Sequence, residues 1–290
     1  MRKEPYLKKQ HPGIQLFALF GVMFVSLIIF NMLAIPLIQN LYGIDLMAET
    51  ALDDLKDKNV LSARRLLAFL IQAGFFLLPC LIFAQLVSYR EENYLRTQGK
   101  IDWKNMVLVF FISIFSIPVI NFLAFLNAQI DLSSFPSTEA EDNFQIAILS
   151  VENFQGFSIN LFVFAVMPAL VEELFFRSVL LRFFFRSSKN MHLAVITGGA
   201  IFAFMHFRPD QFIPMTAMGI LYGYIFFRTG NIWYSITAHF LNNASAVTFH
   251  YLTATGHADE SILTYGTGEN ETIPLVISFL LLTGSVILLF

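Results

Sequence analysis

The sequence predicts an all-α, polytopic membrane protein with about eight transmembrane helices. Hydrophobic residues make up 56% of the 290 residues and charged residues only 13%, whereas soluble domains average roughly 45–50% apolar and 25% charged residues. Eight segments are mostly apolar and close to the roughly 20 residues that a bilayer-spanning helix needs. The loops between them also differ in Lys and Arg content from one side to the other, as expected for an oriented membrane protein.

The eight apolar segments cover residues 14–38, 66–88, 106–126, 157–181, 191–206, 211–228, 231–250 and 273–290. The first follows the basic stretch MRKEPYLKK. It continues for about 24 residues without an A-x-A-like cleavage site, which favours an uncleaved anchor over a signal peptide. The fifth and sixth segments are short and separated only by FRPDQ, so we expect a tight helical hairpin.

The distribution of positive charge predicts that both chain ends lie in the cytoplasm. With eight spans, four basic regions fall on one side, which the positive-inside rule assigns to the cytoplasm. The opposite side receives loops 127–156 and 251–272, which contain no Lys or Arg, while loop 39–65 is mixed. The basic residues are Arg2, Lys3, Lys8, Lys9, Arg90, Arg96, Lys100, Lys104, Arg182, Arg186, Lys189 and Arg228, and the acidic residues of the two opposite loops are Asp131, Glu139, Glu141, Asp142, Glu152, Asp259, Glu260, Glu269 and Glu271.

The net charge does not indicate a nucleic-acid-binding protein, and the cysteine count excludes an intrachain disulfide. The formal net charge is −3, so no basic surface indicates nucleic acid as a partner. The single cysteine, Cys80, cannot form an intrachain disulfide and lies in an apolar run, where we expect a small buried hydrophobe. The expected surroundings are membrane lipid.

Three charged residues, Glu172, Glu173 and Arg177, occur inside the fourth apolar segment. A charge at the centre of a spanning helix costs roughly 2.5–3.5 kcal/mol on insertion scales, so such residues face a bundle interior or a water-filled cavity. Glu173 and Arg177 are four apart and can pair along one helix face. Glu172 is rotated by about 100° from Glu173 and is left as the freer carboxylate. A purely structural ion pair between helices is the alternative, and Pro168, one turn earlier, predicts a bend.

Two later segments also carry polar groups at helical spacing. Phe202 and His206 are four apart, as are His239 and Asn243. Alternatively, His206 is an interfacial residue, and His239 and Asn243 bond one helix to another. Asn242 points about 100° away from Asn243 and is not expected in the same site. The remaining candidates read as solvated or interfacial histidines: His192, His250 and His257.

Together these groups supply the parts for hydrolysis of a peptide bond. A positioned carboxylate or histidine can take a proton from water, and amide or imidazole donors can stabilise an oxyanion. No serine or cysteine nucleophile lies beside a base, and no H-E-x-x-H helix is present.

The three motifs resemble those of the CAAX protease and bacteriocin-processing family, also called the ABI family or type II CAAX prenyl endopeptidases. Their order and spacing agree over about residues 157–250, and the first four spans add no motif beyond the fourth segment's own. The matching residues are Glu172, Glu173 and Arg177 for E-E-x-x-x-R, Phe202 and His206 for F-x-x-x-H, and His239 and Asn243 for H-x-x-x-N.

The resemblance implies an intramembrane endopeptidase, a hydrolase with a conical active-site cavity among its helices and a membrane-bound or lipidated peptide or protein as substrate. It assigns Glu172 as the general base on water, assisted by His206. It assigns His239 and Asn243 to the oxyanion. The residues left to organise the site are Glu173 and Arg177.

The need for a metal is a separate question. Glutamate and histidine side chains can bind zinc, and the ligands would then be Glu172, His206 and His239. The expected pairing of Glu173 with Arg177 favours a mechanism that requires no cofactor. Counting about 1.5 Å per residue places Glu172 and His239 in the cytoplasmic half of the bilayer and His206 nearer the external side.

The predicted organisation is therefore 1–156 for the first three spans and an acidic external loop, 157–250 for the catalytic helices, and 251–290 for a second acidic loop and the last span. The expected location is a bacterial plasma membrane. Two other functions remain open at this stage: a non-catalytic scaffold or regulator on the same fold, and a proton-coupled transporter, since intramembrane Glu, His and Arg also mark ion pathways. The substrate's identity and the oligomeric state are not readable.

Overall fold

The computed structural model describes the whole chain except residues 1–3, 49–52, 90–91, 137, 269–270 and 290. The described residues form helices and loops, with no strand among them, which confirms the predicted all-α class. Four of the charged residues used to predict the orientation lie outside the described residues: Arg2, Lys3, Arg90 and Glu269.

The elements follow one another in the order α1 Pro12–Tyr42, α2 Lys58–Gln72, η1 Ala73–Leu77, α3 Leu78–Val87, α4 Trp103–Asn127, α5 Glu139–Leu149, α6 Phe154–Leu161, η3 Phe162–Val166, α7 Met167–Glu173, η4 Leu174–Leu181, α8 Arg182–Ser188, α9 Met191–Phe204, η5 Pro209–Gln211, α10 Phe212–Thr229, α11 Ile232–Ala254, η6 Glu260–Thr264 and α12 Thr272–Leu289. Of these, η1, η3 and η4 are π-helical and η5 and η6 are 3₁₀-helical.

Five helical stretches of the described chain are long and apolar enough to cross a membrane. They are Pro12–Tyr42, Lys58–Val87, Trp103–Asn127, Phe154–Ser188 and Thr272–Leu289. The other three predicted segments are helical as well. However, α9 has only 14 residues, and α10 and α11 are less apolar. The chain is thus an integral membrane protein with several spans, and the count of eight stays a prediction.

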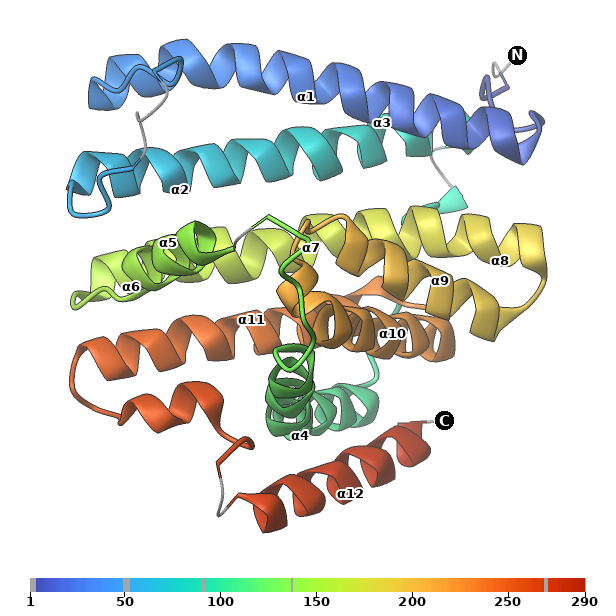
Figure 1. Cartoon of the computed structure of the whole chain (residues 1–290). Helices are drawn as coiled ribbons and strands as arrows, with labels where there is room; N and C mark the ends of the chain where they lie inside the picture. The colour runs from blue at the N-terminus through green and yellow to red at the C-terminus, as the bar shows by residue number, and fades with distance from the viewer. Residues whose placement is uncertain (1–3, 49–52, 90–91, 137, 269–270, 290) are drawn as a thin grey trace.

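The stretch Phe154–Ser188 forms the centre of the molecule. Figure 1 shows α1 and α2–α3 on one side of it, and α11, α4 and α12 on the other. Of its most apolar window, 67% is buried inside the protein, compared with 11–28% for the other four stretches. A helix surrounded by protein can carry polar residues that lipid would exclude, so this is the stretch that can hold Glu172, Glu173 and Arg177.

Two spans widen into π-helical turns just before a proline. In the central stretch η3 ends two residues before Pro168, and η1 likewise ends two residues before Pro79. A proline removes one backbone donor and displaces the preceding turn, and π-turns are a common local adjustment in membrane helices. Ser26 on α1 donates to the carbonyl of Gly74 in η1, with a 2.6 Å separation. The predicted bend near Pro168 therefore takes the form of a local change of helix type.

The hairpin of α9 and α10 is packed backbone to backbone, as the short FRPDQ connection predicted. A Cβ atom added to Gly219 would lie 2.7 Å from the Cα atom of Gly199, so neither position has room for a side chain. Small residues permit such close approach of membrane helices. Because α9 spans about 21 Å at 1.5 Å per residue, it is shorter than the roughly 30 Å hydrocarbon core. The helix α9 alone is therefore too short to cross the membrane.

The predicted external loop 127–156 contains a helix that the sequence analysis missed. The helix α5 begins with Glu139, Glu141 and Asp142, which favour the positive end of a helix dipole. Its far end is held by Arg65, which donates to the carbonyl of Ile148 over 3.0 Å and to the side chain of Asn160 over 2.7 Å.

Candidate active site

Residues from four elements meet beside the central stretch. Glu172 and Glu173 end α7, Arg177 lies in η4, His206 follows α9, and His239 lies in α11. The Nε2 atoms of His206 and His239 lie 3.8 Å and 4.0 Å from Oε2 of Glu172. His206 is therefore at the same depth as the other groups, and the expectation that it lies nearer the external side is wrong. The error came from treating residues 191–206 as a complete span, whereas α9 is too short to be one.

The Glu173 carboxylate contacts two other charged or polar residues of the site. Its Oε1 atom lies 2.8 Å from Nη1 of Arg177 and accepts a 3.0 Å hydrogen bond from Nδ1 of His239. Glu173 is fully buried, so its charge requires such partners. Arg177 also donates through Nη2 to the carbonyl of Gly219 over 3.0 Å. The predicted pairing of Glu173 with Arg177 is confirmed, and the same carboxylate additionally orients a histidine.

The hydrogen bonds of the two histidines fix which ring nitrogen faces Glu172. Nδ1 of His206 lies 2.7 Å from the carbonyl oxygen of Phe202, and Nδ1 of His239 bonds the Glu173 carboxylate. Both partners only accept, so Nδ1 carries the proton in each ring. In the neutral imidazole Nε2 is then an acceptor. Both Nε2 atoms are thus acceptors within 4.0 Å of the Glu172 carboxylate.

Three hydrogen-bond acceptors therefore lie close together with no protein donor between them. They are Oε2 of Glu172 and the Nε2 atoms of His206 and His239. Oε2 of Glu172 is buried and has no hydrogen-bond partner within the described part of the chain. A buried acceptor left unpaired is costly, so the point between Glu172, His206 and His239 suits a small group that offers protons or positive charge. A water molecule offers two protons.

Zinc is the other group that the donor types could hold. Ligands at 2.0–2.1 Å in a tetrahedral site lie about 3.3 Å from one another. The observed separations of 3.8 Å and 4.0 Å are wider. No cluster of three or more His, Cys, Asp or Glu with metal-binding geometry occurs among the described residues. The residues would have to move together to hold zinc, whereas a bridging water fits the wider spacing.

Asn243 lies one turn after His239, and its amide makes a helix-to-helix contact. Nδ2 of Asn243 donates to the carbonyl oxygen of Phe164 over 3.2 Å. In an α-helix that carbonyl would accept from the N–H of residue 168, which is a proline and has none. The contact agrees with the structural alternative considered for this motif, and the second N–H of the amide is available for other chemistry.

A tyrosine that the sequence analysis did not single out lies against both Arg177 and His239. The ring of Tyr222 stacks on the ring of His239, with centroids 5.1 Å apart and planes at 19°, and the Arg177 guanidinium carbon is 5.4 Å from the Tyr222 centroid. Asn242 donates to the Tyr222 hydroxyl over 2.6 Å. Asn242 is thus outside the group around Glu172, as expected, but it holds a residue that touches that group. A buried tyrosine in an apolar helix, whose hydroxyl needs a partner, was the available signal.

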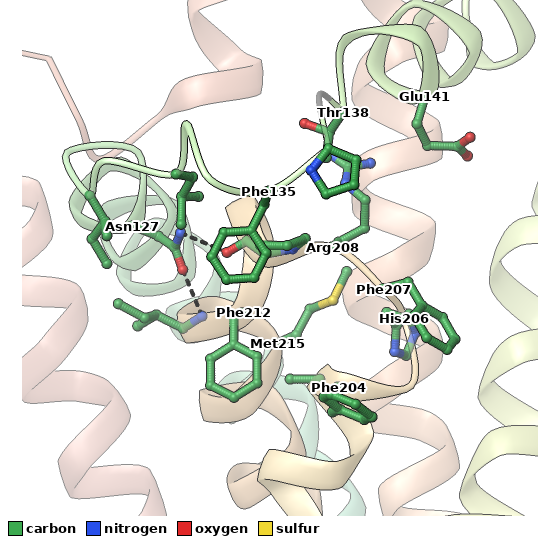
Figure 2. Close-up of a pocket in the computed structure, with 16 residues that line it drawn as sticks. Asn127, Phe135, Thr138, Glu141, Phe204, His206, Phe207, Arg208, Phe212 and Met215 are labelled. Carbon is green, nitrogen blue, oxygen red and sulfur yellow. Dashed lines mark hydrogen bonds between the residues drawn. The ribbon is translucent and has the colours of Figure 1, made fainter.

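A cavity of about 1030 Å³ adjoins the site at His206. Figure 2 shows His206 beside Phe204 and Phe207, with Phe212 and Met215 on the neighbouring wall. Of the six polar motif residues, His206 is the one that lines this cavity. Two of the three histidines expected outside the site have other partners: His192 contacts the Tyr224 hydroxyl and His257 contacts Thr255. The third, His250, lies in the last turns of α11.

Comparison with known proteins points to one family. Residues 154–245 match the family described as type II CAAX prenyl endopeptidase Rce1-like. The Bacillus subtilis (strain 168) protein named "Putative membrane peptidase YdiL" is 24% identical over 191 residues, which cover 66% of this chain and 74% of that protein. The uncharacterized protein YpbD of the same organism is 35% identical over 83 residues, covering 27% of this chain and 39% of YpbD. No solved structure matches.

The matched region holds every residue of the three motifs. Glu172, the first, and Asn243, the last, both fall within 154–245, and the residues around Glu172 described above come from the same region. The similarity to the type II CAAX prenyl endopeptidase Rce1-like family therefore lies in the part of the chain that holds the candidate site.

Proposed function

We propose that this protein is an intramembrane endopeptidase that hydrolyses a peptide bond with a water molecule activated by Glu172. The observation that supports this most is the convergence of three acceptors, from Glu172, His206 and His239, on one point with no protein donor. Such an arrangement holds a water molecule by both of its protons. It also offers a base to take one of them when the oxygen attacks.

The reaction follows general acid–base chemistry. Water attacks the carbonyl carbon, and the proton it loses moves to the Glu172 carboxylate. The negative charge then rests on the former carbonyl oxygen. When the C–N bond breaks, Glu172 returns the proton to the departing amine. The products are a carboxylic acid and an amine, and Glu172 ends ionised as it began.

His206 and His239 have different parts in this scheme. His206 holds the water, because its Nδ1–H is fixed on the Phe202 carbonyl and its Nε2 faces Glu172. The proton that Glu172 takes from the water passes to Nε2 of His239, 4.0 Å away, and the resulting imidazolium, which the adjoining Glu173 carboxylate stabilises, donates to the oxyanion. The proton then returns through Glu172 to the departing amine. The free N–H of Asn243 is the second oxyanion donor. Glu173 and Arg177 position His239.

The proposed reaction requires no metal. The distances from Glu172 to the two histidines support this, since they exceed the spacing of tetrahedral zinc ligands. The proposed setting is the plasma membrane of a bacterium, with both chain ends in the cytoplasm. The substrate is a membrane-associated or lipidated polypeptide.

Purified protein in proteoliposomes, assayed with a library of quenched fluorescent peptides, tests the proposal. We expect cleavage by the wild type and a loss of more than about a hundredfold for Glu172→Gln and for His206→Ala, the scale of losing a general base or its partner. Glu152→Gln makes the same change at an exposed glutamate before α6 and serves as the control. Full activity of Glu172→Gln would refute the mechanism.

A further inference from the structure

The cavity next to His206 connects the site to one side of the molecule. It lies between the end of α4, residues 130–136 and 138–141, and the turn of the α9–α10 hairpin. Figure 2 shows Phe135 and Thr138 from those residues opposite Phe212 and Met215. The His206 side chain is 27% exposed, whereas that of Glu172 is 7% exposed. A polypeptide in this cavity would therefore meet His206 first and Glu172 behind it.

The opposite side of the site is closed by hydrophobic packing. All eight residues of η4, which follow Glu172 and Glu173 toward α8, are buried. Their apolar side chains pack in one cluster with α9, α10 and α11, including Phe202, Phe226 and Ile232. The rings of Phe176 and Phe202 meet edge to face with centroids 5.0 Å apart. Interiors packed in this way contain few voids larger than a water molecule, so a peptide cannot reach Glu172 along this path.

The two sides differ in charge as well as in packing. The closed side holds Arg96 and Lys100 in the loop before α4, Arg186 in the last turn of α8 and Lys189 directly after it. On the cavity side, segments 128–153 and 255–271 contain no Lys or Arg, whereas the loop between α1 and α2 carries Lys56 and the α9–α10 turn carries Arg208. The closed side still holds the larger number of Lys and Arg residues. Cytoplasmic loops carry the excess of Lys and Arg, so the closed side is cytoplasmic and the cavity faces the exterior.

The charged groups inside the cavity limit which part of a polypeptide can bind there. Arg208 is the cation among the described residues that line it, and its guanidinium already bonds Asp142 on α5 and Asp210 in the turn. A terminal carboxylate would have to compete with two carboxylates for this group. The remaining walls are mostly apolar, with Phe204, Phe207 and Phe212 among them.

We infer that the substrate enters from the extracytoplasmic side and is cut within its chain, next to apolar side chains. The substrate class is a membrane-anchored polypeptide whose scissile bond is reached from the extracytoplasmic side, as in the anchor of an exported protein. This rests on the proposed function. It excludes a bond presented from the cytoplasm at a free C-terminus.

Labelling of single cysteines with a membrane-impermeant thiol reagent tests the side of entry. In a Cys80→Ala background, which removes the only native thiol, Met215→Cys reports the cavity. The described, exposed positions Ser133→Cys and Lys100→Cys report the two loop sides. The reagent is added to right-side-out spheroplasts and to inverted membrane vesicles. We expect Met215→Cys and Ser133→Cys to react in spheroplasts and lose that labelling in inverted vesicles, with Lys100→Cys showing the reverse.

Reaction of Met215→Cys from the same side as Lys100→Cys would overturn the inference, as would reaction of Ser133→Cys from the cytoplasm or no reaction at Met215→Cys from either side. Thr138→Cys, at the mouth of the cavity, gives a second reporter if Met215→Cys does not fold. Labelling needs no turnover, so a protein that cleaves nothing would refute the proposed function without affecting this result. Conversely, cytoplasmic labelling together with cleavage would refute only the side of entry.

Discussion

The side-chain amide of Asn243 donates to the carbonyl of Phe164, at 3.2 Å, in the turn that Pro168 disrupts. The motif residue on α11 therefore compensates for a proline on the central stretch. Asn243 thus combines a contact that stabilises the fold with the proposed role of oxyanion donor, and the two roles can be separated by experiment.

Replacing Asn243 is expected to lower stability by about 1 kcal/mol, the scale of side-chain hydrogen bonds between membrane helices. The stability lost through Asn243→Leu should be smaller in a Pro168→Ala background than in the wild type. Pro168→Ala restores a backbone N–H that can bond the Phe164 carbonyl in place of the Asn243 amide. Thermal unfolding in detergent of the two single variants and the double variant measures this coupling. An equal loss with and without Pro168→Ala would show that the contact does not depend on the proline. The loss in kcat, by contrast, should persist in the double variant.

Glu173→Gln is expected to destabilise the protein strongly. It leaves the buried guanidinium of Arg177 without its counter-ion, and breaking a buried ion pair in this way typically costs about 3–5 kcal/mol. The variant Glu173→Gln/Arg177→Gln restores the balance of charge, so part of the stability should return. Activity should stay low, since His239 still lacks its orienting carboxylate. Recovery of kcat in the double variant would contradict the positioning role of Glu173.

Tyr222 is expected to act through the orientation of His239. Tyr222→Phe keeps the ring stacked on His239 but removes the acceptor for Asn242, so kcat should fall slightly. Tyr222→Leu removes the stack as well and should lower kcat about tenfold or more, since small displacements of catalytic groups are costly, with little change in KM. Steady-state assays of both variants test this, and Tyr222→Phe is the conservative control. Equal losses in the two variants, or a change confined to KM, would argue against it.

Metal removal is expected to leave activity unchanged. The groups that could bind zinc, Glu172, His206 and His239, are spaced for a water molecule in the resting site. The measurement is the cleavage rate after dialysis against 1,10-phenanthroline, with the non-chelating 1,7-isomer as control. A loss specific to the chelating isomer that added zinc reverses would establish a metal enzyme instead.

The sequence was informative wherever the relevant contacts are local. The pair of Glu173 and Arg177 follows from a spacing of four on one helix, and the apolar segments matched the observed helices. The bond from Glu173 to His239 joins residues 66 positions apart, and periodicity along one helix carries no information about such a contact. The depth of His206 was wrong because apolar content alone does not distinguish a full span from a shorter helix that ends inside the protein.

Two further features depended on tertiary structure. The helix α5 falls in a predicted loop because acidic residues are typical of a solvated segment, yet they also suit the first turn of a helix. Tyr222 looks like any other apolar-helix residue until Arg177 and His239 are seen on its ring. In both cases the sequence shows residue types that are compatible with two environments, and packing decides between them.

The shortness of α9 has a consequence for how the site is held together. The turn after it carries both His206 and Arg208, and the Arg208 guanidinium is only 13% exposed and bonds Asp142 on α5 as well as Asp210 in the turn. The acidic segment before the central stretch is thereby tied to the turn that brings His206 beside Glu172.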